Sequence, residues 1–225
     1  MKTRTEGAAA GRVLLAIEQL GPHLDAMELA VRLAQSFDAE LAGVLIEDLN
    51  LLRAAGLPFV RELVAYAGEE RALDPGLLLD RQRRQFRRWQ VEIEHKAGEE
   101  GVRTTFHTAR GVGVRAALEL RLAADLIVFG RRGRGRWGEA VVASRMLVLE
   151  DGGDAAARVE AVVARLGGDW PEASVQRMRW RGVEELVAAV RRVRPALVAA
   201  PAGLIGASEL EGVLERVSCP VVLVV

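Results

Sequence analysis

The chain has 225 residues, half of them hydrophobic, so it can form one large domain or two small ones with a sizeable core. Its 31 lysines and arginines balance 31 aspartates and glutamates, which argues against bulk attraction to nucleic acid or to an anionic membrane and leaves only a local patch open. Cys219 is the only cysteine, which excludes an internal disulfide and a multi-cysteine zinc site. The stretch from Met1 to Gly11 lacks the apolar core of a secretion signal, and no apolar run is long enough to span a bilayer. We therefore expect a cytoplasmic protein.

The first elements alternate between strands and helices. Residues 12–18 are predicted to form a buried strand, and apolar residues then recur at helical spacing as far as Phe37. Residues 40–46 form the second predicted strand. The stretch 51–66 has a helical pattern that Gly56 and Pro58 interrupt.

A long helix is predicted over residues 77–97, with Phe86 and Trp89 on its apolar stripe. The rest of its surface is crowded with arginines. Two interpretations stay open, a nucleic-acid face and a solvated face, and pairs such as Arg88–Glu92 favour the second. The arginines are Arg81, Arg83, Arg84, Arg87 and Arg88.

The centre of the pattern is a buried strand over residues 126–129 that stops at a loop rich in glycine and arginine, residues 130–136. Before it, residues 102–109 alternate as a strand and residues 111–122 turn into a helix. Alternating strands and helices predict a parallel sheet covered on both faces, and ligands bind beyond the carboxyl ends of such strands. Glycines there let a backbone approach an anion, although an ordinary basic turn has the same composition.

The second part of the chain repeats this plan in reduced form. Arg110-Gly111-Val112 recurs as Arg181-Gly182-Val183, a shift of 71 residues (182 − 111), and the same shift places Gly130 on Pro201. Residues 145–148 resemble residues 12–15 at a shift of 133 (145 − 12). The difference between these two shifts is about the number of residues from the second strand through the arginine-rich helix. The second repeat is therefore expected to lack that strand–helix unit.

These shifts predict two α/β units, residues 1–144 and residues 145–225. The segment 146–150 opens the second unit in this division, but it could instead close the first. The remaining elements of the second unit are predicted as helix 155–166, strand 174–180, helix 183–193, strand 196–200, helix 208–217 and strand 220–225.

Three stretches of the sequence, RVLLAIE, ADLIVFGRRGRGR and VSCPVVLVV, resemble the universal stress protein (UspA-like) family. The resemblance covers most of the first half and, more faintly, the second. It implies a doubly wound, Rossmann-like parallel sheet of the adenine nucleotide alpha hydrolase-like type, in a tandem form with a degenerate second half. It also implies a role in stress response and an ATP site in the first half.

The family's nucleotide loop has glycines that Gly130 and Gly133 match, whereas Ala143 stands where a third glycine is usual. Backbone amides of such a loop hold phosphate oxygens, with Mg²⁺ as a companion ion. In the second half Pro201 replaces the first loop glycine, so no nucleotide is expected there. The resemblance implies nucleotide contacts from Ile17, Glu18, Ile46, Gly130, Arg131, Arg132, Gly133, Arg134 and Ser144.

The leading hypothesis is a non-enzymatic protein that binds an adenine nucleotide and signals through partners. A ligand-free module of the same fold is the alternative. An ATP-cleaving enzyme ranks lower, because Gln19-Leu20-Gly21 is not the Ser-Gly-Gly loop of such enzymes, so a weak ATPase is the most we expect. Family members dimerise through their last strand, so residues 220–225 are expected to pair with a second copy or with the other half. We expect no membrane or nucleic-acid partner.

Metal and nucleophilic chemistry find little support. His23, His95 and His107 match no metal-ligand spacing, so surface or strand positions are expected for them. Cys219 precedes a proline at the start of a buried strand, which favours a packing role.

Overall fold

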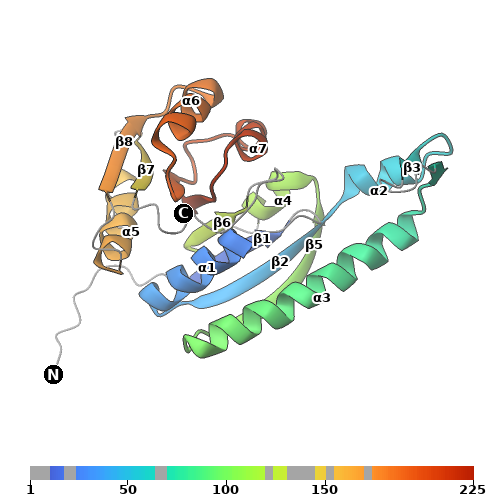
Figure 1. Ribbon diagram of the computed structural model, residues 1–225, viewed down its shortest axis with the longest axis horizontal. Helices are drawn as coiled ribbons and strands as arrows, with labels where there is room; N and C mark the ends of the chain where they lie inside the picture. The colour runs from blue at the N-terminus through green and yellow to red at the C-terminus, as the bar shows by residue number, and fades with distance from the viewer. Residues whose placement is uncertain are drawn as a thin grey trace.

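The computed structural model describes residues 11–17, 24–63, 70–119, 124–130, 145–150, 155–169 and 174–225. Its centre is an eight-stranded sheet in the order β5-β2-β1-β6-β10-β9-β7-β8 (Figure 1). One set of parallel strands comprises β1 (Arg12–Ile17), β2 (Glu40–Asp48), β5 (Thr104–Gly111) and β6 (Leu126–Phe129). A second parallel set comprises β7 (Arg145–Glu150), β8 (Ser174–Arg179), β9 (Leu197–Pro201) and β10 (Val221–Val224).

The two sets meet at β10, which pairs antiparallel with β6 on one side and parallel with β9 on the other. The sheet is therefore mostly parallel, with one antiparallel junction that the alternation of strands and helices did not predict. Both edges of β10 are hydrogen-bonded, so this wholly apolar strand is not left bare.

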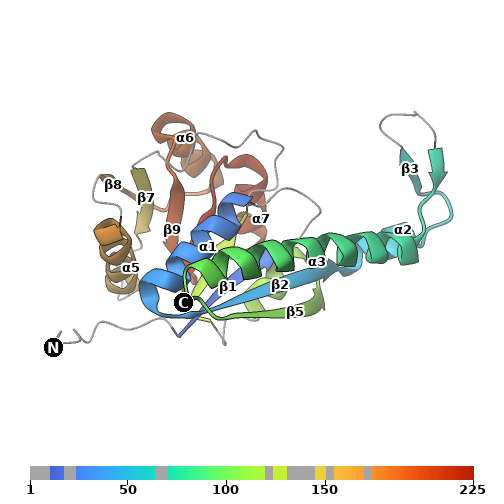
Figure 2. The same ribbon diagram turned by 60° about the horizontal axis from the view of Figure 1, so that its bottom comes forward.

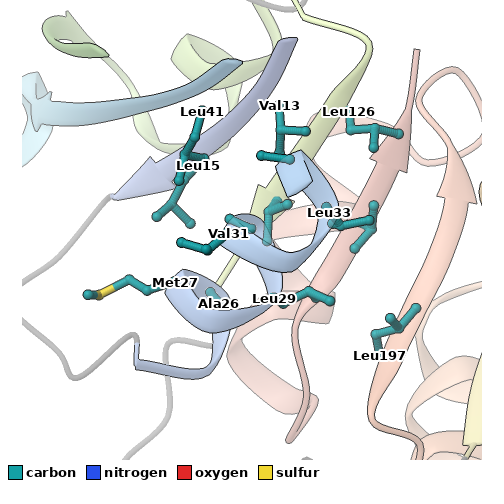
Figure 3. Close-up of a cluster of buried hydrophobic side chains, with 14 of the residues drawn as sticks. Val13, Leu15, Ala26, Met27, Leu29, Val31, Leu33, Leu41, Leu126 and Leu197 are labelled. Atoms are coloured by element: carbon teal, nitrogen blue, oxygen red, sulfur yellow. The ribbon is translucent and has the colours of Figure 1, made fainter. Parts of the chain in front are cut away.

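Helices cover both faces of the sheet and form two apolar cores. One core holds side chains from α1 (Leu24–Phe37), α3 (Pro75–Glu99) and α5 (Ala155–Asp169), and Figure 3 shows side chains of α1 gathered against the strands. The other core holds side chains from α4 (Gly113–Glu119), α6 (Val183–Val193) and α7 (Ala207–Arg216). The strands have continuous apolar runs because both of their faces are covered. Phe86 and Trp89 belong to the first core, as expected.

The predicted helix over residues 51–66 is only partly correct. The structure has a short helix α2 (Leu49–Ala55), and Gly56 ends it. The chain then enters a two-stranded antiparallel sheet of β3 (Arg61–Leu63) and β4 (Glu70–Ala72). Gly56 and Pro58 end the helical pattern, so the prediction that it continues as far as β3 was wrong. The predicted helix 111–122 is present as α4, and residues 120–123 lie outside the described part.

Residues 49–63 and 70–82, which we call the arm, project past the carboxyl end of β2 (Figures 1 and 2). Each helix of the arm has a side-chain cap at its start. The Asp48 carboxylate accepts a hydrogen bond from the backbone N–H of Asn50 at 2.8 Å, and the Asp74 carboxylate accepts one from Gly76 at 2.7 Å. These caps satisfy backbone donors that would otherwise have no partner, so α2 and α3 have defined starting points.

The pairing registers follow the sequence shifts closely. Val13 pairs with Leu126 in β1 and β6, and Met146 pairs with Leu197 in β7 and β9. The first members of these pairs are 133 residues apart (146 − 13) and the second members 71 (197 − 126), the shifts found in the sequence. In the described sheet β7 lies between β9 and β8 and pairs with neither β1 nor β6.

Candidate functional site

Three of the sequence-predicted site residues lie together where β2, β1 and β6 end. We call this end of the sheet, formed by the carboxyl ends of the strands, its carboxyl edge. Ile17 pairs with Leu45, so Ile46 lies one residue farther along the neighbouring strand. Ala16 pairs with Phe129, so Gly130 lies beside Ile17 on the other side. This edge is where parallel α/β sheets bind ligands.

The three residues differ in what surrounds them. Ile17 and Ile46 are both fully buried, Ile17 in the core under α1 and Ile46 in the core under α4. Successive residues of a strand point to opposite faces, which places these two side chains on opposite sides of the sheet. Gly130 is also buried, directly after the last residue of β6. Because Gly130 has no side chain, no Cβ stands between its backbone and a ligand at this end of the strand.

The other predicted contacts lie outside the described residues, namely Glu18, Arg131, Arg132, Gly133, Arg134 and Ser144. The family resemblance implies a helix directly after the Ser144 position, and the structure differs there. β7 begins at Arg145, so a strand follows Ser144 directly, where the family pattern has a helix. The candidate site therefore has no helix N-terminus directly after Ser144 that could help to hold a phosphate.

A buried ion cluster at the same edge was missed by the sequence analysis. Glu47, near the end of β2, has a side chain that is 1 % exposed. Its Oε1 accepts a hydrogen bond from Arg83 Nε of α3 at 3.0 Å, and its Oε2 accepts one from Arg110 Nε of β5 at 2.8 Å. The partners are 36 and 63 residues away, so no local spacing could reveal them.

Burial by itself would raise the pKa of Glu47, but the hydrogen bonds from Arg110 and Arg83 and their positive charges outweigh it and hold the pKa below its ordinary value. The carboxylate is therefore ionised at neutral pH. It ties α3 and β5 to the end of β2, and so fixes the base of the arm next to Ile46.

Asp125, in the ADLIVFG stretch that carries the family resemblance, has a structural position. Its Oδ2 accepts hydrogen bonds from the backbone N–H groups of Gly11 at 2.8 Å and Arg12 at 3.0 Å. The Asp125 N–H donates to the Arg12 carbonyl in turn. Asp125 precedes β6 while Gly130 follows it, so Asp125 lies at the opposite edge of the sheet from the candidate site.

Residues considered for metal or redox chemistry lie away from this edge or are covered. His95 has an exposed side chain, His107 is exposed on β5, and His23 lies outside the described residues. Cys219 is buried in the core under α7, as expected for a packing role. Among the residues that the structure describes, no group of three or more His, Cys, Asp or Glu side chains could hold a metal ion. No helix in the described ranges is long and apolar enough to cross a bilayer.

Comparison with known proteins gives a fold. No family model matches the sequence, and no curated protein matches it. A universal stress protein from Archaeoglobus fulgidus is similar in structure, with a TM-score of 0.51 and 11 % identity over 96 % of each chain. A protein of the universal stress protein family from Burkholderia pseudomallei matches with a TM-score of 0.34 and 16 % identity, over 97 % of this chain and 98 % of that one. Over nearly its full length, the chain has a mostly parallel α/β fold like that of a universal stress protein.

Proposed function

We propose that the chain is a non-enzymatic, universal-stress-type protein that binds an adenine nucleotide, ATP in the first instance, at the carboxyl edge of β2, β1 and β6. The observation that carries this proposal is the position of Gly130. It follows the last residue of β6 and lies beside Ile17, where backbone N–H groups can approach a phosphate.

In this proposal the loop after Gly130, with Arg131, Arg132, Gly133, Arg134 and Ser144, supplies the phosphate contacts. Glu18 holds the nucleoside and Ile46 packs against the base. Guanidinium groups are well suited to phosphate because they combine charge with paired N–H donors. Mg²⁺ would arrive with the nucleotide and be held mainly by its phosphates, since the described residues offer no cluster of acidic or histidine ligands.

We also propose that the chain is a tandem protein whose second unit, residues 145–225, is a reduced copy that has lost nucleotide binding. The matching registers of β1 with β6 and of β7 with β9 support the duplication. Pro201 ends β9 at the position that corresponds to Gly130, where it removes a backbone N–H donor.

A cytoplasmic role in stress signalling through partners follows from the family resemblance and belongs to the same proposal. For the assembly, the antiparallel pairing of β10 with β6 supports intramolecular pairing of the two units. A homodimer would then have to use another surface, because both edges of β10 are already paired.

A ligand-free module of the same fold is the second candidate, and one observation favours it. Ile17 and Ile46 are fully covered by the protein itself, so a base packed on Ile46 would have to displace neighbouring side chains. The first candidate therefore predicts a measurable rearrangement around Ile46 when nucleotide binds, and the second predicts none.

Calorimetric titration with ATP and Mg²⁺ distinguishes the two candidates. The wild type should bind at millimolar ATP or below, and Gly130→Val should weaken binding at least about tenfold, because a β-branched side chain obstructs close approach of the phosphates. Gly203→Val is the matched control. Gly203 lies in the loop after β9, where an added Cβ would meet nothing within 4 Å, so ATP affinity should not change.

Thermal unfolding of both variants checks that the fold is intact. Arg132→Gln provides a second test should Gly130→Val fail to fold, and it should also weaken ATP binding. Absence of binding by the wild type at millimolar ATP would contradict the nucleotide site and favour the ligand-free module. Equal binding by Gly130→Val and Gly203→Val would do the same.

A further inference from the structure

The arm carries most of the exposed large apolar side chains in the described part of the chain. Phe59 is 74 % exposed and Leu77 is 53 % exposed, and Leu51 and Leu57 are exposed nearby. Val91, which is 67 % exposed, follows on α3. Apolar side chains gathered in one exposed region mark an interaction surface more often than scattered ones do.

Three exposed arginines, Arg84, Arg87 and Arg88, accompany these apolar side chains on α3. The structure gives none of them an ion pair with another described residue, and the expected Arg88–Glu92 pair is not among the ion pairs of the described part. Their neighbours behave differently, because Arg81 pairs with Glu62 and Arg83 pairs with Glu47. All three side chains are exposed, as expected for a solvated face, and within the described part of the chain they are available to a negatively charged partner.

The charged and apolar groups share one side of α3. Leu77, Arg84 and Val91 are spaced by seven residues, and Arg88 follows Arg84 by four, so these positions lie on one face of the helix. Arg87 flanks that face. The opposite face carries the buried stripe of Leu78, Gln82, Phe86, Trp89, Ile93 and Ala97. We call the face of Leu77, Arg84, Arg87, Arg88 and Val91 the outer face of α3, and Figure 1 shows α3 along the lower border of the fold.

We propose that the outer face of α3 binds an anionic phospholipid surface. A bilayer interface accepts both components of this face, since phosphate headgroups neutralise the guanidinium groups while Leu77 and Val91 enter the headgroup–acyl boundary. Leu57 and Phe59, in the segment between α2 and β3, add exposed apolar side chains to the arm. The overall charge balance of the chain does not oppose this, because only charges within about 10 Å of the membrane act strongly at 0.1 M salt.

Two other occupants fit the face less well. A second copy crossing on the same face would bring three arginines and only one aspartate, Asp80, of each α3 together, which is repulsive overall. A nucleic acid would neutralise the arginines but leave Leu77 and Val91 without an apolar partner, since its outer surface is a charged backbone. The proposal concerns a different part of the molecule from the nucleotide site and stands or falls separately from it.

Vesicle flotation of the full chain tests the proposal. At 50 mM salt the chain should float with vesicles of phosphatidylcholine and phosphatidylglycerol in a 3:1 ratio and stay unbound with phosphatidylcholine alone. Substituting glutamine at Arg84, Arg87 and Arg88 together should lower the partition coefficient about a hundredfold, as expected for three basic residues near the surface. The pair Leu77→Ser and Val91→Ser should lower it at least about tenfold by removing apolar insertion.

Matched controls separate this face from general charge and hydrophobicity. Glutamine at Arg115, Arg158 and Arg179 removes the same charge from three exposed arginines on α4, α5 and β8, and should leave binding within about twofold of wild type. Val112→Ser removes an exposed valine outside the arm and should have no effect on binding. No binding to anionic vesicles, equal loss in the control triple variant, or an arginine-dependent shift of a 20-base oligonucleotide without vesicle binding would each overturn the proposal.

Discussion

Gly43 and Phe106 face each other across β2 and β5, and a Cβ added at Gly43 would lie 2.6 Å from the Phe106 ring. The ring therefore occupies the space that a side chain at position 43 would take. It also packs edge-on against Phe86 of α3, with ring centroids 6.1 Å apart and planes at 78°. One glycine thus lets an aromatic side chain on the edge strand β5 reach the long helix that carries the arm.

Gly43→Ala should lower the free energy of unfolding by about 1–3 kcal/mol, because the methyl group must push the Phe106 ring out of its packed position. Urea unfolding at neutral pH measures the change. Gly98→Ala is a control of opposite sign, since Gly98 lies in α3 with nothing within 4 Å of an added Cβ. It should raise stability by about 0.5–1 kcal/mol. A Gly43→Ala protein as stable as wild type would contradict the close packing of this pair.

Glu47→Gln should lower the free energy of unfolding by about 2 kcal/mol. The amide removes the negative charge between Arg83 and Arg110, and its NH₂ group turns a donor toward one of these donors. Glu94→Gln is the control, because Glu94 is an exposed glutamate of α3 without an ion pair among the described residues. Its stability should stay within about 0.5 kcal/mol of wild type.

The difference in unfolding free energy between the wild type and Glu47→Gln should depend on pH. The folded-state pKa of Glu47 lies below its ordinary value of 4.5, so the unfolded state takes up the proton first as pH falls. The stabilisation is therefore complete above about pH 5 and is lost as the pH falls through the folded-state pKa. The difference in stability between wild type and Glu47→Gln should be constant from about pH 5 to 8 and shrink below about pH 4. A difference that grew on acidification would show that Glu47 is not held ionised by the two arginines.

Asp125→Ala should destabilise the protein by about 1–2 kcal/mol, because the backbone N–H groups of Gly11 and Arg12 lose a charged acceptor. Hydrogen exchange should quicken first at the start of β1. The affinity for ATP should stay unchanged at a temperature where the variant is folded, since Asp125 and Gly130 lie at opposite ends of β6. Weakened ATP binding by folded Asp125→Ala would place this aspartate in the ligand site instead.

Most of the fold could be predicted from the sequence because its strands are buried on both faces. Continuous apolar runs such as Leu126–Phe129 are distinctive, and the alternation with helices specifies an α/β sheet. The arm was harder to predict, because the short strands β3 and β4 are only three residues each and the side chains of β4 are all exposed. The antiparallel junction of β10 with β6 joins positions 92 to 98 residues apart (221 − 129 and 224 − 126), for which local patterns carry no signal.

One part of the candidate site could also be predicted from the sequence, and another part could not. The position of Gly130 at the carboxyl end of β6 could be predicted, because a glycine directly follows an apolar run. The Glu47 cluster could not, because its two arginines come from other elements and only the folded sheet brings them together. The one available signal was an acidic residue at the end of an otherwise apolar strand, a position that costs stability unless cations neutralise it.

The place of β10 also bears on how the protein folds during synthesis. β6 has β1 on one side from early on, but its other edge is completed by a strand that comes after all the other strands of this sheet in the sequence. Until β10 is made, the apolar edge of β6 is open to wrong partners, such as the same edge of a neighbouring nascent chain. Slow pairing between distant strands makes that interval longer. We therefore expect the first strands to depend on chaperones while the ribosome is still translating residues 145–225.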